Sequence, residues 1–398
     1  MTAVPEAPAG PVAPVGPPAD RRRSPVPTGA MVASKFMELR KRRGLMVAMA
    51  VVTIGIPTIF LLIRLLLHAV APKTYGPAGG YDIYTSLTSG VLYIFGFIMA
   101  AALGATAGSA DLSEGVFRHL VVTGRSRLAL YLARIPAGLA IIVPMVAVGF
   151  TIVCAVCVFA APTQLSYNSV NVPSGLSQAG FQSWAADHPD EVICNFDLRI
   201  GPSSPIAAAV NSVPCGGGPS GGAVIEKGSG GPEQPGVQPQ ASEAQIRRAA
   251  SLIAQMNYRD YSRQFLSPSI SLMVRTGLWI ELEVLIGFVV ALGLASLIGQ
   301  RTVAVILMII LEVVLTPILS RARIPHLANL QRAVVGLATA HLTPGGLPVF
   351  GGGGGGPAGG SGNPALLAES TTVAVIVIVI WLVAWSVVGA WRMMTRDA

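Results

Sequence analysis

The sequence predicts an all-α membrane protein with about six transmembrane helices, a cytoplasmic amphipathic N-terminal helix and a large extracytoplasmic loop. Three observations predict this class. Only 12% of the 398 residues are charged, whereas soluble globular domains carry roughly 25%. The mean hydropathy is +0.62. The chain also contains six apolar runs, each close to the ~20 residues that a helix needs to cross a hydrocarbon core of about 30 Å.

The apolar runs predict where the spans lie. They occupy residues 45–70, 84–107, 135–160, 278–298, 303–319 and 372–391. Three spans therefore fall in a first block at 45–160, two in a block at 276–320, and the last at 371–398, where a short cytoplasmic tail follows it. The fifth run is the shortest of the six.

Two different segments precede the first span. Residues 1–30 are rich in Pro, Ala and Gly and lack hydrophobic periodicity, so we expect a disordered tail. In 31–44, Val32, Phe36 and Leu39 recur at helical spacing. This pattern predicts an amphipathic helix that lies on the cytoplasmic surface. An N-terminal extension of the first span fits the same pattern equally well.

Charge predicts the orientation. Basic residues gather just before the first span, opposed only by Glu6, Asp20 and Glu38; they are Arg21, Arg22, Arg23, Lys35, Arg40, Lys41, Arg42 and Arg43. Such clusters stay in the cytoplasm, so we expect both termini and 108–134 inside. The Ala-, Gly- and Arg-rich composition is typical of a GC-rich bacterial genome, which predicts a bacterial plasma membrane. No soluble domain with base-stacking aromatics is evident, so we expect no nucleic-acid partner.

The segment 161–275 is then extracytoplasmic. Its first part, 163–215, has mixed composition and could be ordered, and 216–240 has the composition of a flexible linker. Its last part, 242–265, is predicted to be a helix that begins with a capping box at Ser242.

A second outer segment, 321–370, separates the last two spans. Its apolar stretch at 327–342 is interrupted by polar residues, so we interpret it as a short or re-entrant helix. The six glycines at 351–356 lack phosphate-binding spacing, so we assign no nucleotide site there.

The four cysteines form two pairs. Cys194 and Cys215 share the outer segment, where a disulfide would close a loop of about 20 residues and contribute roughly 3 kcal/mol. Two separate free thiols are the alternative. Cys154 and Cys157 lie inside the third predicted span, where we expect small packing residues rather than a redox pair.

Side chains suited to chemistry are sparse. No two histidines have metal-ligand spacing, so we predict no metal site, and we expect no enzyme. Glu312 falls midway along the fifth span, where a carboxylate either lines a conduit or is a buried, hydrogen-bonded structural residue. We place Glu281 and Glu283 at the outer start of the fourth span, near water.

One loop resembles a known family. The stretch AGSADLSEGVFRHLVVTGRSRLALYLAR at 107–134 resembles the first cytoplasmic loop of ABC-2 type transporter permeases. The residues that occupy the family's loose pattern are Asp111, Glu114, Gly115, Arg118, Leu120, Ser126 and Arg127. The amphipathic helix before the first span and an extended outer segment before the last also fit. The long outer segment 161–275 departs from the simplest members and leaves the substrate open.

The resemblance implies a permease subunit of an ATP-binding cassette exporter, working as a homodimer or heterodimer of permeases. The chain has no G-x-x-x-x-G-K-[ST] run, so ATP would be bound by a partner ATPase chain. The residues implied at the ATPase interface are Asp111, Glu114, Gly115, Arg118, Arg125 and Arg127. Alternatively, these are ordinary positive-inside residues, and the chain is an assembly factor or sensor that works through its outer loop.

Overall fold

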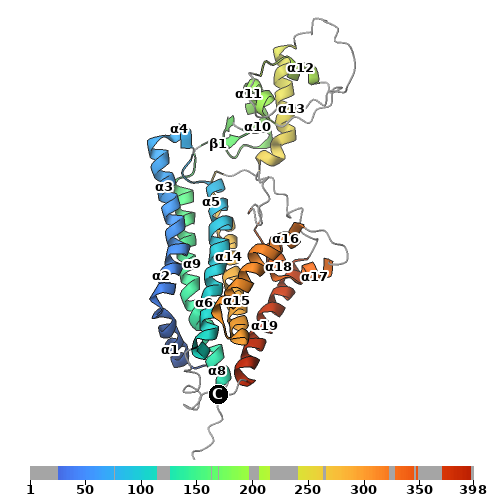
Figure 1. Cartoon of the computed structure of the whole chain (residues 1–398). Coiled ribbons are helices and arrows are strands. Elements are labelled where there is room, and N and C mark those ends of the chain that lie inside the picture. Colours follow the sequence, from blue (N-terminus) through green and yellow to red (C-terminus); the bar gives the residue numbers. More distant parts are fainter. Residues whose placement is uncertain are drawn as a thin grey trace, which may run out of the picture.

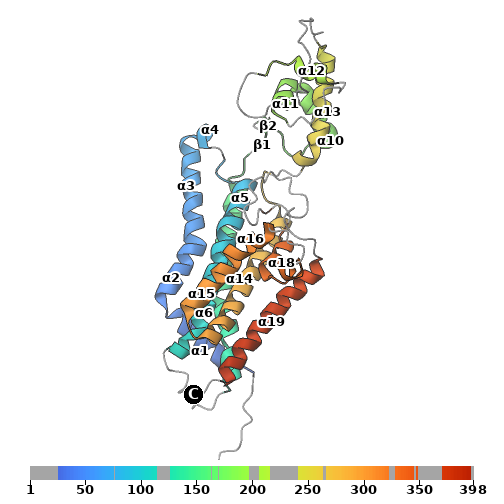
Figure 2. The same ribbon diagram turned by 45° about the vertical axis from the view of Figure 1, so that its right-hand side comes forward.

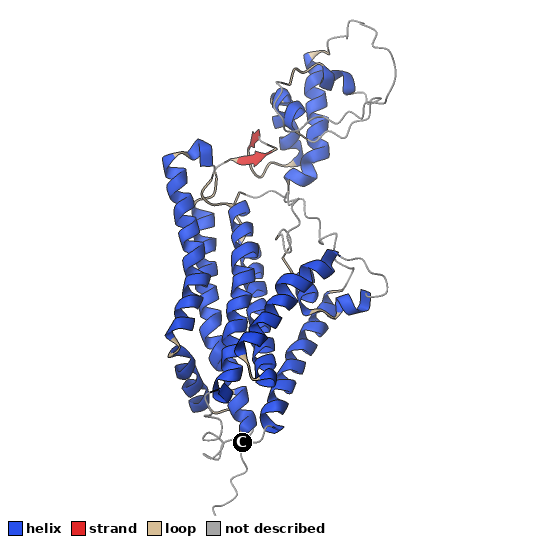
Figure 3. Ribbon diagram, in the orientation of Figure 1, coloured by secondary structure: helices blue, strands red, loops and turns tan. Residues whose placement is uncertain are grey.

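The computed structural model of the chain is a helical bundle with a smaller outer domain at one end (Figure 1). The residues that it describes are 26–75, 77–113, 126–162, 164–168, 170–196, 206–215, 241–262, 266–321, 328–344, 347 and 370–395. Residues 1–25 of the predicted tail 1–30, the linker 216–240 and the glycine run 351–356 lie outside these residues, whereas Gly29 and Ala30 already belong to the first helix. Figure 3 shows that helices make up almost all of the described chain.

The six predicted spans are confirmed as helices long and apolar enough to cross a membrane. They are Arg43–Val70, Tyr81–Ala110, Arg127–Phe159, Ile270–Ile298, Arg301–Ser320 and Thr371–Thr395. All six extend beyond the apolar runs that predicted them at one end or both. The fourth begins at Ile270 because Ser269 caps it, its hydroxyl oxygen accepting from the Leu272 N–H at 3.2 Å.

Three of the spans contain a π-helical segment. Span one is α2 (Arg43–Ala50), η1 (Val51–Gly55) and α3 (Ile56–Val70), followed by the short α4 (Pro72–Tyr75). Span two is α5 (Tyr81–Leu87), η2 (Thr88–Tyr93) and α6 (Ile94–Ser113). Span five is α15 (Arg301–Ile309), η3 (Ile310–Leu315) and α16 (Thr316–Arg321). Such segments insert one extra residue in a helical turn and are frequent at functional sites.

The other spans are uninterrupted by π turns. Span three joins α8 (Arg127–Leu132) to α9 (Arg134–Phe159), span four is α14 (Ile270–Ile298) and span six is α19 (Thr371–Thr395). Helix α14 is the most buried of the six and packs against α6, α9, α15 and α19. In the view turned by 45°, α19 lies at the right-hand side of the bundle and is tilted relative to the other spans (Figure 2).

Glycines let α14 approach its neighbours closely. A Cβ at Gly104 of α6 would collide with the Phe288 carbonyl oxygen of α14, and one at Gly108 would collide with the Leu292 carbonyl oxygen. Because these glycines are four residues apart, they form a G-x-x-x-G stripe on one helix face. Close backbone approach of this kind is the usual means of helix association in lipid.

The N-terminal helix is distinct from the first span. Helix α1 (Gly29–Arg40) ends before Arg42, and α2 begins at Arg43. Its buried residues are Met31, Lys35 and Leu39. Val32 and Phe36, predicted for the apolar face, are only partly buried. The difference follows from packing on α8 and α9, which turns the buried stripe by one residue.

Two short helices follow span five, α17 (Ala328–Arg332) and α18 (Val335–His341). Helix α18 packs against α16 and α19, and its residues Val335–Ala340 are buried. Trp381 of α19 donates its indole N–H to the Ala333 carbonyl at 2.8 Å, between the two helices. A side chain of the last span thus provides a hydrogen-bond donor for a backbone carbonyl that lies between two helices.

The outer domain is built between spans three and four. A hairpin of β1 (Leu165–Tyr167) and β2 (Val170–Val172) leads to α10 (Gln178–Asp187), α11 (Pro189–Asn195), α12 (Ala207–Asn211) and α13 (Glu243–Tyr261). Its core is aromatic: the rings of Phe181 and Tyr261 stack with centroids 4.1 Å apart, and Tyr167 meets Phe196 edge to face at 4.9 Å.

A disulfide joins Cys194, at the end of α11, to Cys215, which follows α12. In the bundle, Cys157 is buried in the apolar core of α9 and Cys154 is half-buried. The first pair therefore closes a loop of the outer domain, and the second is a packing pair.

Candidate functional site

Polar side chains meet near the middle of the bundle, where the sequence is otherwise apolar. Tyr93 ends η2, Trp279 and Glu283 lie one turn apart on α14, and Glu312 lies in η3. Thr339 of α18 completes the group. We call these five residues the polar cluster. All five are buried, so three spans and a short helix bring together side chains that are costly to hold in lipid.

A series of contacts links Glu312, Tyr93, Trp279 and Thr339 of the polar cluster. The Tyr93 hydroxyl donates to Glu312 Oε1 at 2.6 Å. The Tyr93 ring stacks on Trp279 with centroids 4.9 Å apart. The Trp279 indole N–H donates to the Thr339 carbonyl at 3.1 Å. Spans two, four and five are thereby tied to α18 through two aromatic side chains.

The two carboxylates are only partly satisfied. Glu283 is 1% exposed and Glu312 is 3% exposed, and their charges lie close enough to interact. Among the described residues, Glu283 Oε1 and Glu312 Oε2 each have no hydrogen-bond partner. A buried acceptor left unpaired costs about 1–3 kcal/mol. The arrangement therefore favours a proton, a cation or a donor group of a substrate at these oxygens.

Gly336 lets α18 reach the Glu312 carboxylate. A Cβ at this position would collide with Glu312 Oε2 and would lie 2.6 Å from the Thr316 hydroxyl oxygen. Thr316 in turn donates to the Leu311 carbonyl at 2.8 Å, five residues earlier, which is the spacing of the π turn. The π segment and the glycine together set the position of the acid against α18.

The position of Glu283 corrects the sequence-based expectation. We expected Glu281 and Glu283 near water at the outer start of span four. Because α14 begins at Ile270, both lie in the middle of the span, and Glu283 is buried. Glu281 is partly buried, and its Oε2 has no partner among the described residues.

Sequence reasoning missed three residues of the polar cluster, Tyr93, Trp279 and Thr339, and misplaced a fourth, Glu283. The spacing of Trp279 and Glu283, four residues apart on an apolar helix, was a signal that could have found two of them. Tyr93 and Thr339 had none, since their place depends on π turns and on the return of α18 into the bundle.

The predicted ATPase-interface residues are described only in part. Arg127 begins α8 and donates through Nη1 to the Met394 carbonyl of α19 at 3.1 Å. Ser126 caps α8, its hydroxyl oxygen accepting from the Ala129 N–H at 3.3 Å. The side chain of Asp111 and all of Glu114, Gly115, Arg118 and Arg125 lie outside the described residues.

A metal centre has no support in the described part of the chain, where no three His, Cys, Asp or Glu side chains converge. No protein-family model, no curated protein and no solved structure matches the sequence or the fold. The polar cluster, a buried polar group inside an otherwise apolar bundle, is the feature that bears most directly on function.

Proposed function

We propose that this chain is the transmembrane permease subunit of an ATP-binding cassette exporter, powered by a separate ATPase chain. The observation that carries the proposal is the pair of buried carboxylates beside a short helix that returns into the bundle. Intramembrane acids usually mark a substrate or ion pathway. Non-helical backbone at membrane depth is tolerated only where protein buries it or where it lines a water-filled cavity.

The polar cluster supplies what such a pathway needs. Two carboxylate oxygens that have no hydrogen-bond partner among the described residues can accept a hydrogen bond from a passing substrate or coordinate a cation. The short helix α18 is held by its packing on α16 and α19, by the Trp279 hydrogen bond to Thr339 and by the Trp381 hydrogen bond to Ala333 just before it. Its interface with the spans is shorter than that of a full span. We propose that conformational change at α18 opens the path past Glu283 and Glu312.

The partner and the orientation complete the proposal. The loop 108–134 resembles the segment by which ABC-2 permeases dock to their ATPase, and we propose that it faces the cytoplasm with both termini. Helix α1 and the C-terminal end of α19 lie at one end of the bundle and the outer domain at the other (Figure 1), as an even number of spans requires. We propose a bacterial plasma membrane and a dimer of permeases.

An assembly factor or sensor is the second candidate. The observation that favours it is the ordered outer domain, which has its own aromatic core and a disulfide. Such a protein would need neither an ATPase nor a water-accessible path through the spans.

The experiment has two arms. In the first, tagged chain is purified from native membranes and the ATP hydrolysis that co-purifies is measured. In Glu114→Lys and in Arg118→Glu, the co-purifying ATP hydrolysis should fall at least about tenfold, because breaking a desolvated charge pair costs about 2–5 kcal/mol. The amount of each variant in the membrane should stay unchanged. Arg248→Glu, on the outer helix α13, is the matched control and should have no effect.

The second arm tests the path. In a Cys154→Ala/Cys157→Ala background, Thr339→Cys should react with a water-soluble thiol reagent during ATP turnover, and Ala291→Cys in the core of α14 should not. Both positions are buried, at 1% and 0% exposed, so exposure alone cannot separate them. Absence of any co-purifying ATPase, with both cysteines unreactive, would refute the exporter and favour the sensor.

A further inference from the structure

Helix α18 covers both buried acids of the polar cluster. Gly336 lies directly against the Glu312 carboxylate, since a Cβ at this position would collide with Oε2. Thr339, one turn later on the same helix, lies beside Glu283. Glu312 is 3% exposed and Glu283 is 1% exposed. Displacement of α18 would therefore uncover both carboxyl groups together, whereas in this conformation both are shielded from water.

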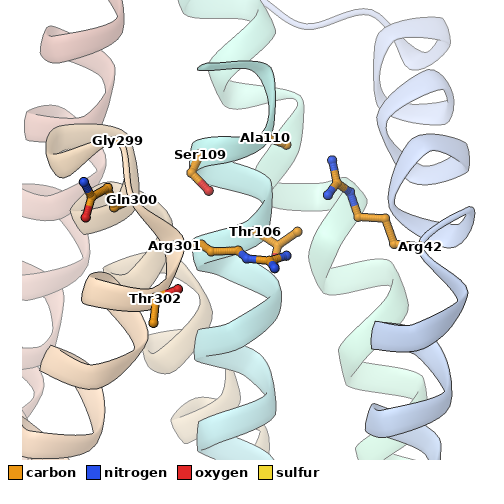
Figure 4. A pocket seen from close by; sticks show the side chains of 8 residues that line it. All are labelled: Arg42, Thr106, Ser109, Ala110, Gly299, Gln300, Arg301 and Thr302. Atoms are coloured by element: carbon orange, nitrogen blue, oxygen red, sulfur yellow. The ribbon is translucent and has the colours of Figure 1, made fainter. Parts of the chain in front are cut away.

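A pocket of about 430 Å³ lies in a different part of the bundle. It is lined by Arg42, by Thr106, Ser109 and Ala110 of α6, and by the turn 299–302 (Figure 4). No residue of the polar cluster lines this pocket. The pocket therefore provides no opening at the two acids, and the state of the pair depends on the helices that pack around it.

Among the described residues, no basic side chain acts on either acid. Tyr93 is the titratable group that faces the pair from span two. The other ionisable side chains of the elements packed around the pair include none that acts on it; in the described part of the chain they are Arg134, Cys154, Cys157, Arg275, Glu281, Arg301, Arg332, His341 and Arg392. The two acids therefore lack a counter-ion from the protein.

Two ionised carboxylates cannot both be held in such a place, because each buried charge is costly and the second is repelled by the first. Glu283 Oε1 and Glu312 Oε2 each lack a hydrogen-bond partner among the described residues. A proton on one acid removes one of the two charges and supplies an O–H donor. A metal ion or an organic cation would need space, and Gly336 packs directly on the Glu312 carboxylate. A proton needs none.

Hydrogen bonding indicates which acid carries the proton. The Tyr93 hydroxyl donates to Glu312 Oε1 at 2.6 Å, a length typical of a hydroxyl bound to an ionised carboxylate. Glu283 is the more deeply buried of the two acids. Glu312 is therefore the charged member of the pair, and Glu283 is the protonated one.

We propose that Glu283 and Glu312 form a proton-binding site, in which Glu283 holds one proton while α18 is closed and releases it to water when α18 moves away. The bond that breaks is the O–H of Glu283, and water accepts the proton. Because the closed state binds one proton more than the open state, lower pH favours closure. Buried acids serve as proton relays in membrane pumps. The inference rests on the proposed path past α18 and does not depend on the ATPase.

The first test is infrared spectroscopy of the full chain, purified in a neutral detergent without ATP and compared in H₂O and D₂O. Wild type should show the C=O band of a protonated, buried carboxyl group. Glu283→Gln should lose this band, and Glu312→Gln should shift it, because the group next to the O–H has changed. Glu281→Gln is the matched control on the same helix and should leave the band unchanged. A wild type without the band would overturn the site however the variants fold, and so would a band that persists in Glu283→Gln.

The second test follows α18. In a Cys154→Ala/Cys157→Ala background, Ala338→Cys places a thiol at a position that is 0% exposed. Its rate of reaction with a water-soluble thiol reagent is measured against pH without ATP. The same cysteine in Glu283→Gln corrects for titration of the thiol itself. The corrected rate should rise with pH by up to about tenfold per pH unit, the limit for one proton released on opening. Parallel profiles in the two backgrounds would overturn the release of the proton.

These outcomes separate the proton site from the exporter. Absence of a co-purifying ATPase, with the Glu283 band and the pH profile present, would refute the exporter and support the proton site. A co-purifying ATPase in a chain without the band would overturn the proton site alone. Thermal stabilisation of such a chain by Na⁺ or Ca²⁺, lost in Glu283→Gln, would assign the two oxygens to a metal cation instead.

Discussion

The outer domain and the helix bundle arrange their apolar side chains in opposite ways. In the outer domain the large aromatic rings lie inside, and Phe181 is 0% exposed. In the bundle, Ile59, Leu62 and Ile380 each point outward and are 58% exposed. The interior of the bundle instead holds glycine contacts and the polar cluster.

The difference follows from the solvent that each region meets. Water drives apolar surface of the outer domain into a core, whereas lipid tails are as apolar as leucine and give the spans no such drive. Spans therefore associate by close backbone approach and by internal hydrogen bonds. The same hydrophobic side chain signals a core position in one region and a surface position in the other.

The largest expected effect comes from removing the Cys194–Cys215 disulfide of the outer domain. Cys194→Ser with Cys215→Ser should destabilise this domain by about 3 kcal/mol, because the unfolded loop regains its entropy. Hydrogen exchange should show about 100-fold lower protection in α10–α13. Protection in α14 should stay unchanged, since the described helices that carry or adjoin the disulfide, α11 and α12, pack mainly on α10, α13 and β2.

The control is thiol labelling, in which neither cysteine of the wild type should react before reduction. Equal loss of protection in α14 and α13 would contradict the independence of the two regions.

A single added methyl group should destabilise the bundle without affecting the outer domain. Gly104→Ala places a Cβ against the Phe288 carbonyl oxygen, and overpacking of this kind costs about 1–3 kcal/mol. Hydrogen exchange in α6 and α14 should accelerate, and the outer domain should be unaffected. Gly90→Ala is the matched control, because no atom beyond its chain neighbours and its own helix backbone lies within 4 Å of the added methyl group. Similar effects of the two substitutions would show that the close approach is unimportant.

The smallest expected effect concerns one hydroxyl in the outer domain. Tyr261 donates to the Pro173 carbonyl at 2.5 Å and accepts from the Leu176 N–H at 3.0 Å. Tyr261→Phe should cost about 1 kcal/mol in the free energy of unfolding of this domain. Thermal unfolding followed by the near-UV signal of the aromatic core would measure it.

The same variant tests how the stability of the outer domain depends on pH. Burial raises the pKa of Tyr261, so its folded form holds the proton more tightly than its unfolded form. The resulting stability is complete below the ordinary tyrosine pKa of about 10 and is lost as pH rises through the raised value. Wild type should therefore lose stability more steeply than Tyr261→Phe in alkaline solution. Parallel pH profiles would contradict this assignment.

Span positions could be predicted because hydropathy is a local sum over consecutive residues. Span ends could not, because they depend on caps such as Ser269 and on charged residues that extend past the lipid. The shift at span four moved Glu283 from the expected water-exposed edge into the interior. The helix expected at 242–265 is α13, whose capping box is marked by the Ser242 N–H donating to Gln245 Oε1 at 2.8 Å.

From the sequence, the candidate site could be predicted only through Glu312, because an acidic residue within an apolar run is easily recognised. Its partners come from other spans, and their register depends on π turns that no hydropathy pattern reveals. The Gly104 and Gly108 stripe was visible in the sequence, yet its partner helix could be known only from the fold. The predicted ATPase interface stays a prediction.

Gly336 has a consequence for how related sequences can diverge. The lipid-facing positions of α3 and α19 accept any apolar residue of similar size, so they carry little information about ancestry. At 336 any side chain would displace the Glu312 carboxylate. A chain that keeps this acid in the same position against α18 is therefore expected to keep a glycine twenty-four residues later. Joint presence of the two residues would help to identify distant relatives after the rest of the sequence has diverged.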